Sequence, residues 1–178
     1  ILPLQQYPIK GVIWYQGESN AHNMDAHEQL FRLLVDSWRS NWKNPEMPFY
    51  FVQLSSLNRP SWTWFRDSQL RLMKSIPNTG MAVSSDQGDS LDVHPTHKQP
   101  VGERLGRWAL NQTYGHAVTP SGPIYNKVVE KGDNLVVSFT YGDGLRTSDG
   151  KSPSCFEIAE EDGLFYPAQV KIEGSKVR

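Results

Sequence analysis

Apolar and polar residues follow one another along the first two thirds of the chain in a pattern that predicts strands and helices in turn. Short apolar runs typical of buried strands lie at residues 11–16, 48–54 and 80–85. Apolar residues recur at helical spacing over residues 25–44, over residues 61–76, and from just after His94 to about Tyr114. This alternation predicts an α/β domain with a parallel sheet covered by helices.

The pattern changes after residues 119–123, which are rich in proline and glycine. Strand-like runs cover residues 124–130, 135–141, 156–159 and 165–170, with Gly-Asp turns among them. This pattern predicts antiparallel β structure. We therefore expect two regions, residues 1–118 and residues 119–178. The second is thin for an independent β unit, so we expect some of its strands to need partners from another segment.

Charge and composition exclude several classes of function. The 18 basic and 19 acidic residues are interspersed, which gives a formal net charge of -1 and no basic run for nucleic acid or an anionic membrane surface. The apolar runs are too short to span a bilayer, and the first residues lack the pattern of a secretion signal. The single cysteine, Cys155, excludes an intrachain disulfide and a thiol-based zinc site.

The segment Gln16-Gly17-Glu18-Ser19-Asn20 follows the first predicted strand. Ligand groups in open α/β sheets lie where strands end. Gly17 would let the backbone approach a substrate closely, and backbone amides with the carboxamides of Gln16 and Asn20 would donate to a developing oxyanion. Alternatively, Ser19 or Asn20 caps the next helix and Glu18 is a solvated charge.

His94 follows the third predicted strand, with Asp86, Asp89 and Asp92 upstream. A histidine in this position can act as a general base, and a carboxylate can fix its tautomer and stabilise the imidazolium. Asp92 is the nearest acid, while Asp86 and Asp89 stay open. Alternatively, the aspartates form turns and His94 is an ordinary polar residue before a helix that begins at Pro95.

A metal site is a rival interpretation of the same segment. Asp89, Asp92, His94 and His97 are suitable ligands for zinc or manganese. However, Pro95 separates the two histidines, and no further histidine or cysteine group completes a recognisable signature. We therefore expect no metal and no cofactor.

The predicted second helix carries Arg66 and Gln69, which share one helical face and can both point at a carboxylate or a sugar hydroxyl. Alternatively, both are surface residues of an amphipathic helix. Six tryptophans, Trp62 and Trp64 among them, and the turn-rich β region favour a rival function, a non-catalytic carbohydrate-binding or structural module.

Four segments together resemble the sialate O-acetylesterase family, a branch of the SGNH-type hydrolases. They are GVIWYQGESNA from Gly11, WFRDSQ from Trp64, DVHPTHKQPVGERLGRWAL from Asp92 and GPIYNKVVEKGDNLVVSFTYGDGL from Gly122. The resemblance implies a flavodoxin-like three-layer α/β/α domain, incomplete at its N-terminus and followed by a β-rich region. It also implies removal of O-acetyl groups from sialic acid or related sugars by a secreted or periplasmic protein.

Carried over to this sequence, the resemblance assigns Gln16, Gly17 and Glu18 to the oxyanion and substrate block and His94 to the catalytic base. The family's nucleophilic serine lies in a GQSN-like segment that this chain does not contain. A triad without its serine cannot form an acyl-enzyme, and in the resemblance Ser19 belongs to the oxyanion block. We therefore expect the chain to begin midway through the domain, to be inactive alone, and to self-associate through an exposed sheet edge.

Overall fold

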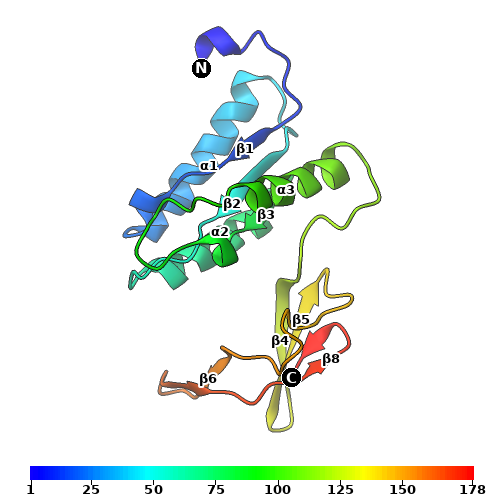
Figure 1. The fold of residues 1–178 in the computed structure, drawn as a ribbon. Coiled ribbons are helices and arrows are strands. Elements are labelled where there is room, and N and C mark those ends of the chain that lie inside the picture. Colours follow the sequence, from blue (N-terminus) through cyan, green and yellow to red (C-terminus); the bar gives the residue numbers. More distant parts are fainter. The chain divides into compact units, whose positions relative to one another are not determined.

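Three parallel strands form the sheet at the centre of the first of two units, Ile1–Ser121 and Gly122–Arg178 (Figure 1). The computed structural model describes all residues from Ile1 to Arg178. The strands are β1 (Val12–Trp14), β2 (Phe49–Gln53) and β3 (Thr79–Val83), and the helices are α1 (Met24–Asn41), α2 (Trp62–Ser75) and α3 (Gln99–Trp108). Short 3-10 turns lie at Leu2–Leu4, Glu18–Asn20 and Ser85–Gln87, and a π-helical turn at Ala109–Thr113.

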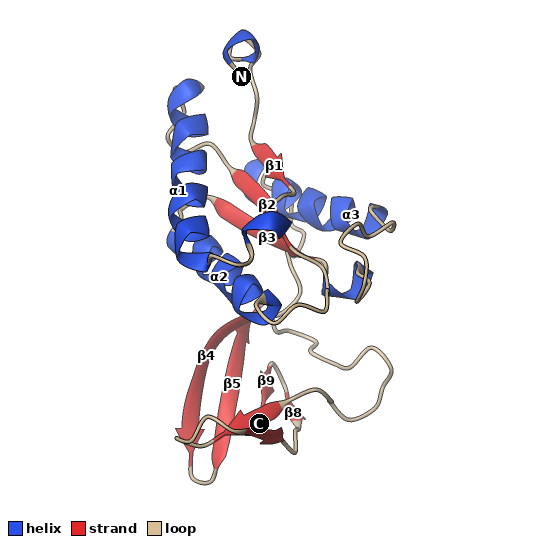
Figure 2. Ribbon diagram, turned by 90° about the vertical axis from the view of Figure 1, so that its left-hand side faces the viewer, coloured by secondary structure: helices blue, strands red, loops and turns tan.

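The central strand β2 is buried along its whole length, as its continuous apolar run predicts. Side chains alternate between the two faces of a strand, so Phe49 and Phe51 pack beneath α1 and α2, while Tyr50 faces Trp108 of α3. Figure 2 shows α1 and α2 on one side of the sheet and α3 on the other. The predicted α/β class with helices on both faces of a parallel sheet is confirmed.

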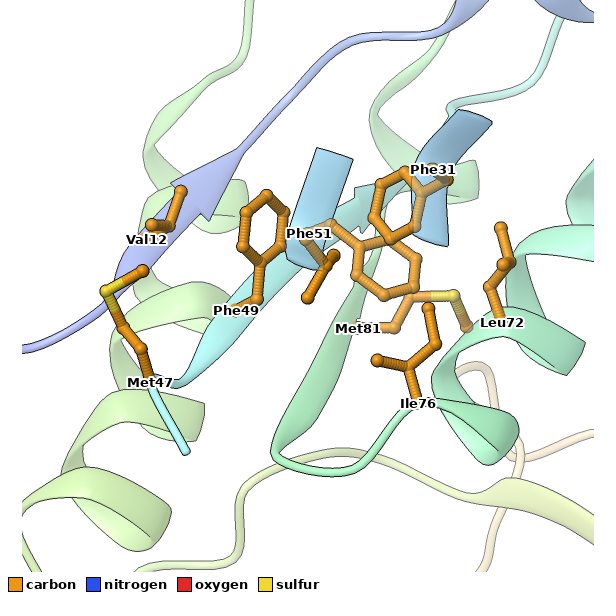
Figure 3. Packing of buried hydrophobic residues seen from close by; sticks show 9 residues of the cluster. Val12, Phe31, Met47, Phe49, Phe51, Leu72, Ile76 and Met81 are labelled. Carbon is orange, nitrogen blue, oxygen red and sulfur yellow. The ribbon is translucent and has the colours of Figure 1, made fainter. Parts of the chain in front are cut away.

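Aromatic rings dominate the core between the sheet and its first two helices (Figure 3). Phe31 of α1 packs edge-on against Phe51, with ring centroids 4.9 Å apart, and also against Phe49. Leu72 brings α2 into the same cluster and is fully buried. Burying each such side chain stabilises the fold by roughly 1.5–3 kcal/mol, so this cluster is the main source of stability in the first unit.

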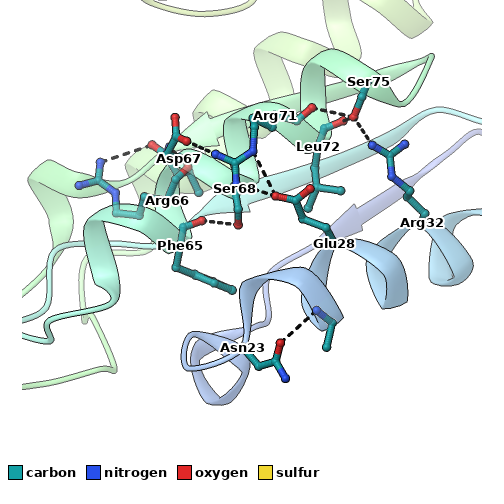
Figure 4. Close-up of polar contacts among 12 residues, drawn as sticks. Asn23, Glu28, Arg32, Phe65, Arg66, Asp67, Ser68, Arg71, Leu72 and Ser75 are labelled. Atoms are coloured by element: carbon teal, nitrogen blue, oxygen red, sulfur yellow. Dashed lines mark hydrogen bonds and ion pairs between the residues drawn. The ribbon is translucent and has the colours of Figure 1, made fainter. Parts of the chain in front are cut away.

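Polar contacts tie α1 to α2 on their exposed side (Figure 4). Arg71 pairs with Glu28 at 2.7 Å and also with Asp67, and the guanidinium of Arg32 donates to the hydroxyl of Ser75 at 2.6 Å. Exposed ion pairs contribute only about 0.2–1 kcal/mol each, so they orient the helices while the core stabilises them. None of the helices combines the length and the apolarity that crossing a membrane would require.

Helix α3 begins at Gln99, four residues later than the predicted start at Pro95. The expected start at Pro95 would place Pro100 inside the helix, where a proline removes one hydrogen bond and clashes with the preceding turn. With the observed start, Pro100 lies in the first turn, where its missing N–H has no cost. Residues 94–98 are therefore a loop, and they keep His94 outside the helix.

The sheet and α3 approach each other most closely at Gly80 of β3. The ring of Trp108 occupies the space that a side chain at Gly80 would fill. Its indole Nε1 donates to the carbonyl of Met81 at 2.9 Å. One indole thus fixes both the spacing and the register of α3 on the sheet.

The second unit consists of antiparallel strands, which confirms the predicted β-rich region. A four-stranded sheet has the order β4-β5-β9-β8, and a separate hairpin pairs β6 with β7. The bounds are β4 (Ile124–Lys131), β5 (Asn134–Thr140), β6 (Glu157–Ala159), β7 (Phe165–Pro167), β8 (Ile172–Glu173) and β9 (Lys176–Val177). The only large apolar side chains buried in this unit are those of Ile124 and Val177, so its core is thin.

Candidate functional site

A cavity of about 480 Å³ lies where the three parallel strands of the first unit end. Each of the three connections that follow a strand contributes to it, as is usual for ligand sites in open α/β sheets. The lining residues are Tyr15, Gln16, Glu18 and Ser19 after β1, Arg59 after β2, and Val93, His94 and Lys98 after β3. The structure therefore brings the predicted groups Gln16, Glu18 and His94 to one cavity.

Gly17 gives the first connection its shape. Its φ of 135° lies in a region that other residues rarely adopt, and it is the buried residue in the turn that presents Gln16 and Glu18. A Cβ atom at this position would lie 3.5 Å from both His27 and Phe65. The glycine thus allows a tight turn packed on the helices below, while it does not itself line the cavity.

His27 of α1 lies beneath this turn and is only 5% exposed. Its Nδ1 is 3.4 Å from the side-chain nitrogen of Asn20, so Asn20 contacts the helix below and is not among the residues lining the cavity. Burial lowers the pKa of His27, which keeps the imidazole neutral. A neutral ring can accept from Asn20 through Nδ1 and thereby support the turn.

The third connection holds His94 at the cavity. The His94 backbone N–H donates to Asp92 Oδ1 at 2.8 Å, and the Nδ1 atom of the ring lies 3.5 Å from the same oxygen. Asp89 accepts the backbone N–H groups of Leu91 and Asp92, which is a turn-forming role. Of the three candidate acids, Asp92 is the one in contact with His94, whose side chain is 89% exposed.

Asp86 is occupied elsewhere. Both of its carboxylate oxygens accept from the guanidinium of Arg104 at 2.6 Å, and the same guanidinium donates to the carbonyl of Val83. The hydrogen bonds from Arg104 hold the pKa of Asp86 well below its usual range. This pair anchors α3 to the end of β3 and takes no part in orienting His94.

Asp86→Asn is expected to destabilise the first unit by about 0.5–1 kcal/mol at neutral pH, since both partners are partly exposed. The folded pKa is lowered, so the stabilisation is fully present above the ordinary value of 3.8 and declines progressively as the pH falls from there towards the folded pKa. Denaturant unfolding at pH 7 and at about pH 2 measures this decline, with Asp36→Asn at an exposed site as control. An equal gap between wild type and Asp86→Asn at both pH values would contradict the assignment.

Arg66 and Gln69 do not reach the cavity. The carboxamide of Gln69 accepts from the N–H of Leu54 and donates to the carbonyl of Val52, and its side chain is buried. Arg66 bonds with Gln53 at the end of β2. Both side chains therefore join α2 to β2, because the helical face they share points to the sheet and not to the ligand.

The structure also bears on the two rival interpretations, a metal site and a carbohydrate-binding module. Asp89, Asp92, His94 and His97 line a second hollow, yet no three acidic, histidine or cysteine side chains of the chain come together as a group that would hold a metal ion. Trp62 is 4% exposed and its indole donates to the carbonyl of Ser55, so it cannot stack on a sugar. Trp64 is exposed.

The sequence pattern did not single out two residues that line the cavity, Arg59 and Lys98. Arg59 lies in the loop after β2, which is the place where the same rule located Gln16 and His94. That loop carries no acid or histidine that would draw attention to it. The helix predicted from just after His94 includes Lys98, but α3 begins at Gln99 and leaves Lys98 in the loop.

Comparisons with known proteins show that the chain is similar to carbohydrate esterases. The family model described as carbohydrate esterase, sialic acid-specific acetylesterase, matches residues 3–113. The sialate O-acetylesterase of Mus musculus is 33% identical over 184 residues, which cover 89% of this chain and 34% of the mouse protein. The human protein of the same name is 31% identical and is covered to 35%. The chain thus spans about a third of the length of these relatives.

A solved structure is similar over nearly the whole chain. The crystal structure of a carbohydrate acetylesterase from Xanthomonas citri matches with a TM-score of 0.91 and 34% sequence identity. The match covers 98% of this chain and 42% of the bacterial one. The similarity therefore includes both units described above.

Proposed function

The chain belongs to the sialic acid-specific acetylesterase family of carbohydrate esterases, and from this premise we propose that it supplies the histidine side of a site that removes O-acetyl groups from sialic acid or related sugars. The observation that carries the proposal is the meeting of Gln16, Glu18 and His94 in one cavity at the ends of parallel strands. The complete site also needs a serine, which we place outside this chain.

The proposed reaction is acyl transfer in two steps. The serine hydroxyl attacks the acetyl carbonyl while His94 takes its proton, and the sugar oxygen leaves with the proton that His94 returns. Backbone amides of the turn at Gly17 and the carboxamide of Gln16 donate to the oxyanion. Water, activated by His94, then releases acetate and frees the serine.

Asp92 is the proposed partner of His94. Its Oδ1 already accepts the backbone N–H of His94 and lies 3.5 Å from Nδ1 of the ring. A small rotation of the imidazole would shorten this contact to a hydrogen bond and direct Nε2 towards the serine. The carboxylate would then stabilise the imidazolium as it forms.

We also propose where the protein acts and how it associates with a further chain. We place the protein outside the cytoplasm, in keeping with the resemblance to secreted or periplasmic enzymes. Within this unit β1 pairs only with β2, and its residue Ile13 is 68% exposed. An unpaired strand edge beside an exposed apolar side chain is a template for a further strand, which supports association through this edge.

The chain alone is expected to hydrolyse 4-nitrophenyl acetate no faster than the uncatalysed background, because it lacks the serine that forms the acyl-enzyme. The longer protein is expected to release acetate from O-acetylated sialic acid, measured by an enzyme-coupled assay. Hydrolysis by the chain alone that disappears in both His94→Ala and Ser19→Ala would overturn the placement of the serine and make Ser19 the nucleophile.

A further inference from the structure

We propose that Arg59 and Lys98 form a carboxylate-binding subsite beside His94, which makes the cavity selective for acetylated sugar acids over neutral acetylated sugars. The proposal rests on the proposed esterase function, because it assumes that the cavity receives the sugar of the ester. Arg59 and Lys98 come from different connections, the loop after β2 and the loop before α3, and both line the same cavity as His94.

More basic than acidic side chains line the cavity, in a chain whose formal net charge is -1. Arg59 and Lys98 face one carboxylate, that of Glu18, among the lining residues. Neither cation forms an ion pair with any carboxylate of the chain, including Glu18, whereas Arg71, Arg104 and Arg178 do. Arg59 Nη1 donates to the backbone carbonyl of Glu18 at 3.4 Å, so both cations line the cavity without a carboxylate partner.

Each of the two cations lies over an aromatic ring and not beside a carboxylate. Lys98 Nζ lies 4.3 Å from the centre of the Tyr15 ring, and the guanidinium carbon of Arg59 lies 5.6 Å from the Trp62 ring. Trp62 is itself fixed by the hydrogen bond to Ser55. A ring face restrains a cation without neutralising it, so the charge stays available to a ligand.

The geometry suits a monosaccharide acid. A volume of about 480 Å³ is within the range of small-ligand sites, roughly 300–1,000 Å³. The planar fork of Arg59 can bind a carboxylate through two parallel hydrogen bonds, and Lys98 adds a second charge. A sugar acid held in this way would present its acetylated hydroxyl to His94, while a neutral sugar would leave both cations without a partner.

The test compares N-acetylneuraminic acid with its methyl ester, a neutral ligand of nearly the same shape. Binding of each to the chain is followed by ¹H–¹⁵N NMR titration. The acid is expected to bind more tightly than the ester, and Arg59→Gln and Lys98→Gln are each expected to weaken its binding by about three- to fivefold. The double variant is expected to lose about ten- to twenty-fivefold, since the two effects add in free energy, and binding of the ester is expected to be unchanged.

Lys10→Gln is the matched control, because Lys10 is exposed and does not line the cavity. It removes the same charge and is expected to leave binding unaltered. Added salt is expected to weaken binding of the acid and not of the ester. The proposal is overturned if the chain does not bind the acid, if the ester binds equally well, or if Lys10→Gln weakens binding as much as Lys98→Gln.

This titration separates the subsite from the chemistry, since binding does not need the serine. Selective binding of the acid by the chain, together with a longer protein that releases no acetate, would overturn the proposed function and leave the subsite standing. Release of acetate with equal affinity for the acid and the ester would do the reverse.

Discussion

His94→Ala in the longer protein is expected to lower kcat/KM for acetate release by about 10⁴- to 10⁶-fold. In the proposed mechanism His94 removes the proton from the serine as it attacks and returns it to the departing sugar oxygen, and the variant loses both steps. The substitution is expected to leave the fold intact, because the side chain is 89% exposed. Steady-state hydrolysis of an O-acetylated sialic acid measures the effect.

His97→Ala is the control for that experiment. His97 is an exposed histidine three residues further along the same loop, and it does not line the cavity that holds Gln16 and His94. Its loss is expected to change kcat/KM by less than about twofold, since surface substitutions away from a site have small effects. A His94→Ala variant that keeps a tenth of the activity would remove His94 from the role of base.

Leu72→Ala is expected to destabilise the first unit by about 3–5 kcal/mol, the largest stability effect of those predicted here. Leu72 is fully buried between α2 and the sheet, so its loss leaves a cavity lined by Phe51, Ile76 and Met81. All six tryptophans lie within residues 1–121. Denaturant unfolding followed by tryptophan fluorescence therefore reports on this unit alone.

Leu33→Ala makes the same chemical change on a helix of the same unit, at a side chain that is 63% exposed. It is expected to alter the free energy of unfolding by less than about 0.5 kcal/mol. Equal losses in the two variants would mean that Leu33 is covered in solution, for example by a second copy, and would contradict the assignment of Leu72 to the main core.

The elements of the first unit could be predicted because each buries one face against the sheet. The run at Phe49–Gln53 is apolar at nearly every position, and the structure covers it on both sides. The start of α3 could not be predicted from periodicity, since the apolar spacing continues back towards His94 while Pro100 decides where the helix begins. In the second unit, β8 and β9 have two residues each, too few to show alternation.

The candidate site was predictable where a residue lies in the connection that follows a strand, as Gln16, Glu18 and His94 do. It was not predictable where it depends on which way a helical face points. Arg66 and Gln69 share a helical face, but their spacing does not show whether that face points to the ligand or to the sheet. The structure turns it to β2, where Gln69 bonds the backbone of Val52 and Leu54. Sequence position likewise could not show that Asp86 is held by Arg104.

The lack of a side chain at Gly80 affects more of the structure than its contact with Trp108. The Trp108 indole lies directly on β3, so even one added methyl group at Gly80 would push Trp108, and α3 with it, away from the sheet. Lys98 caps that helix, and His94 lies four residues earlier. A larger residue at position 80 would therefore displace α3 together with the loop before it, and would separate the imidazole of His94 from the turn at Gly17, although neither contacts Gly80.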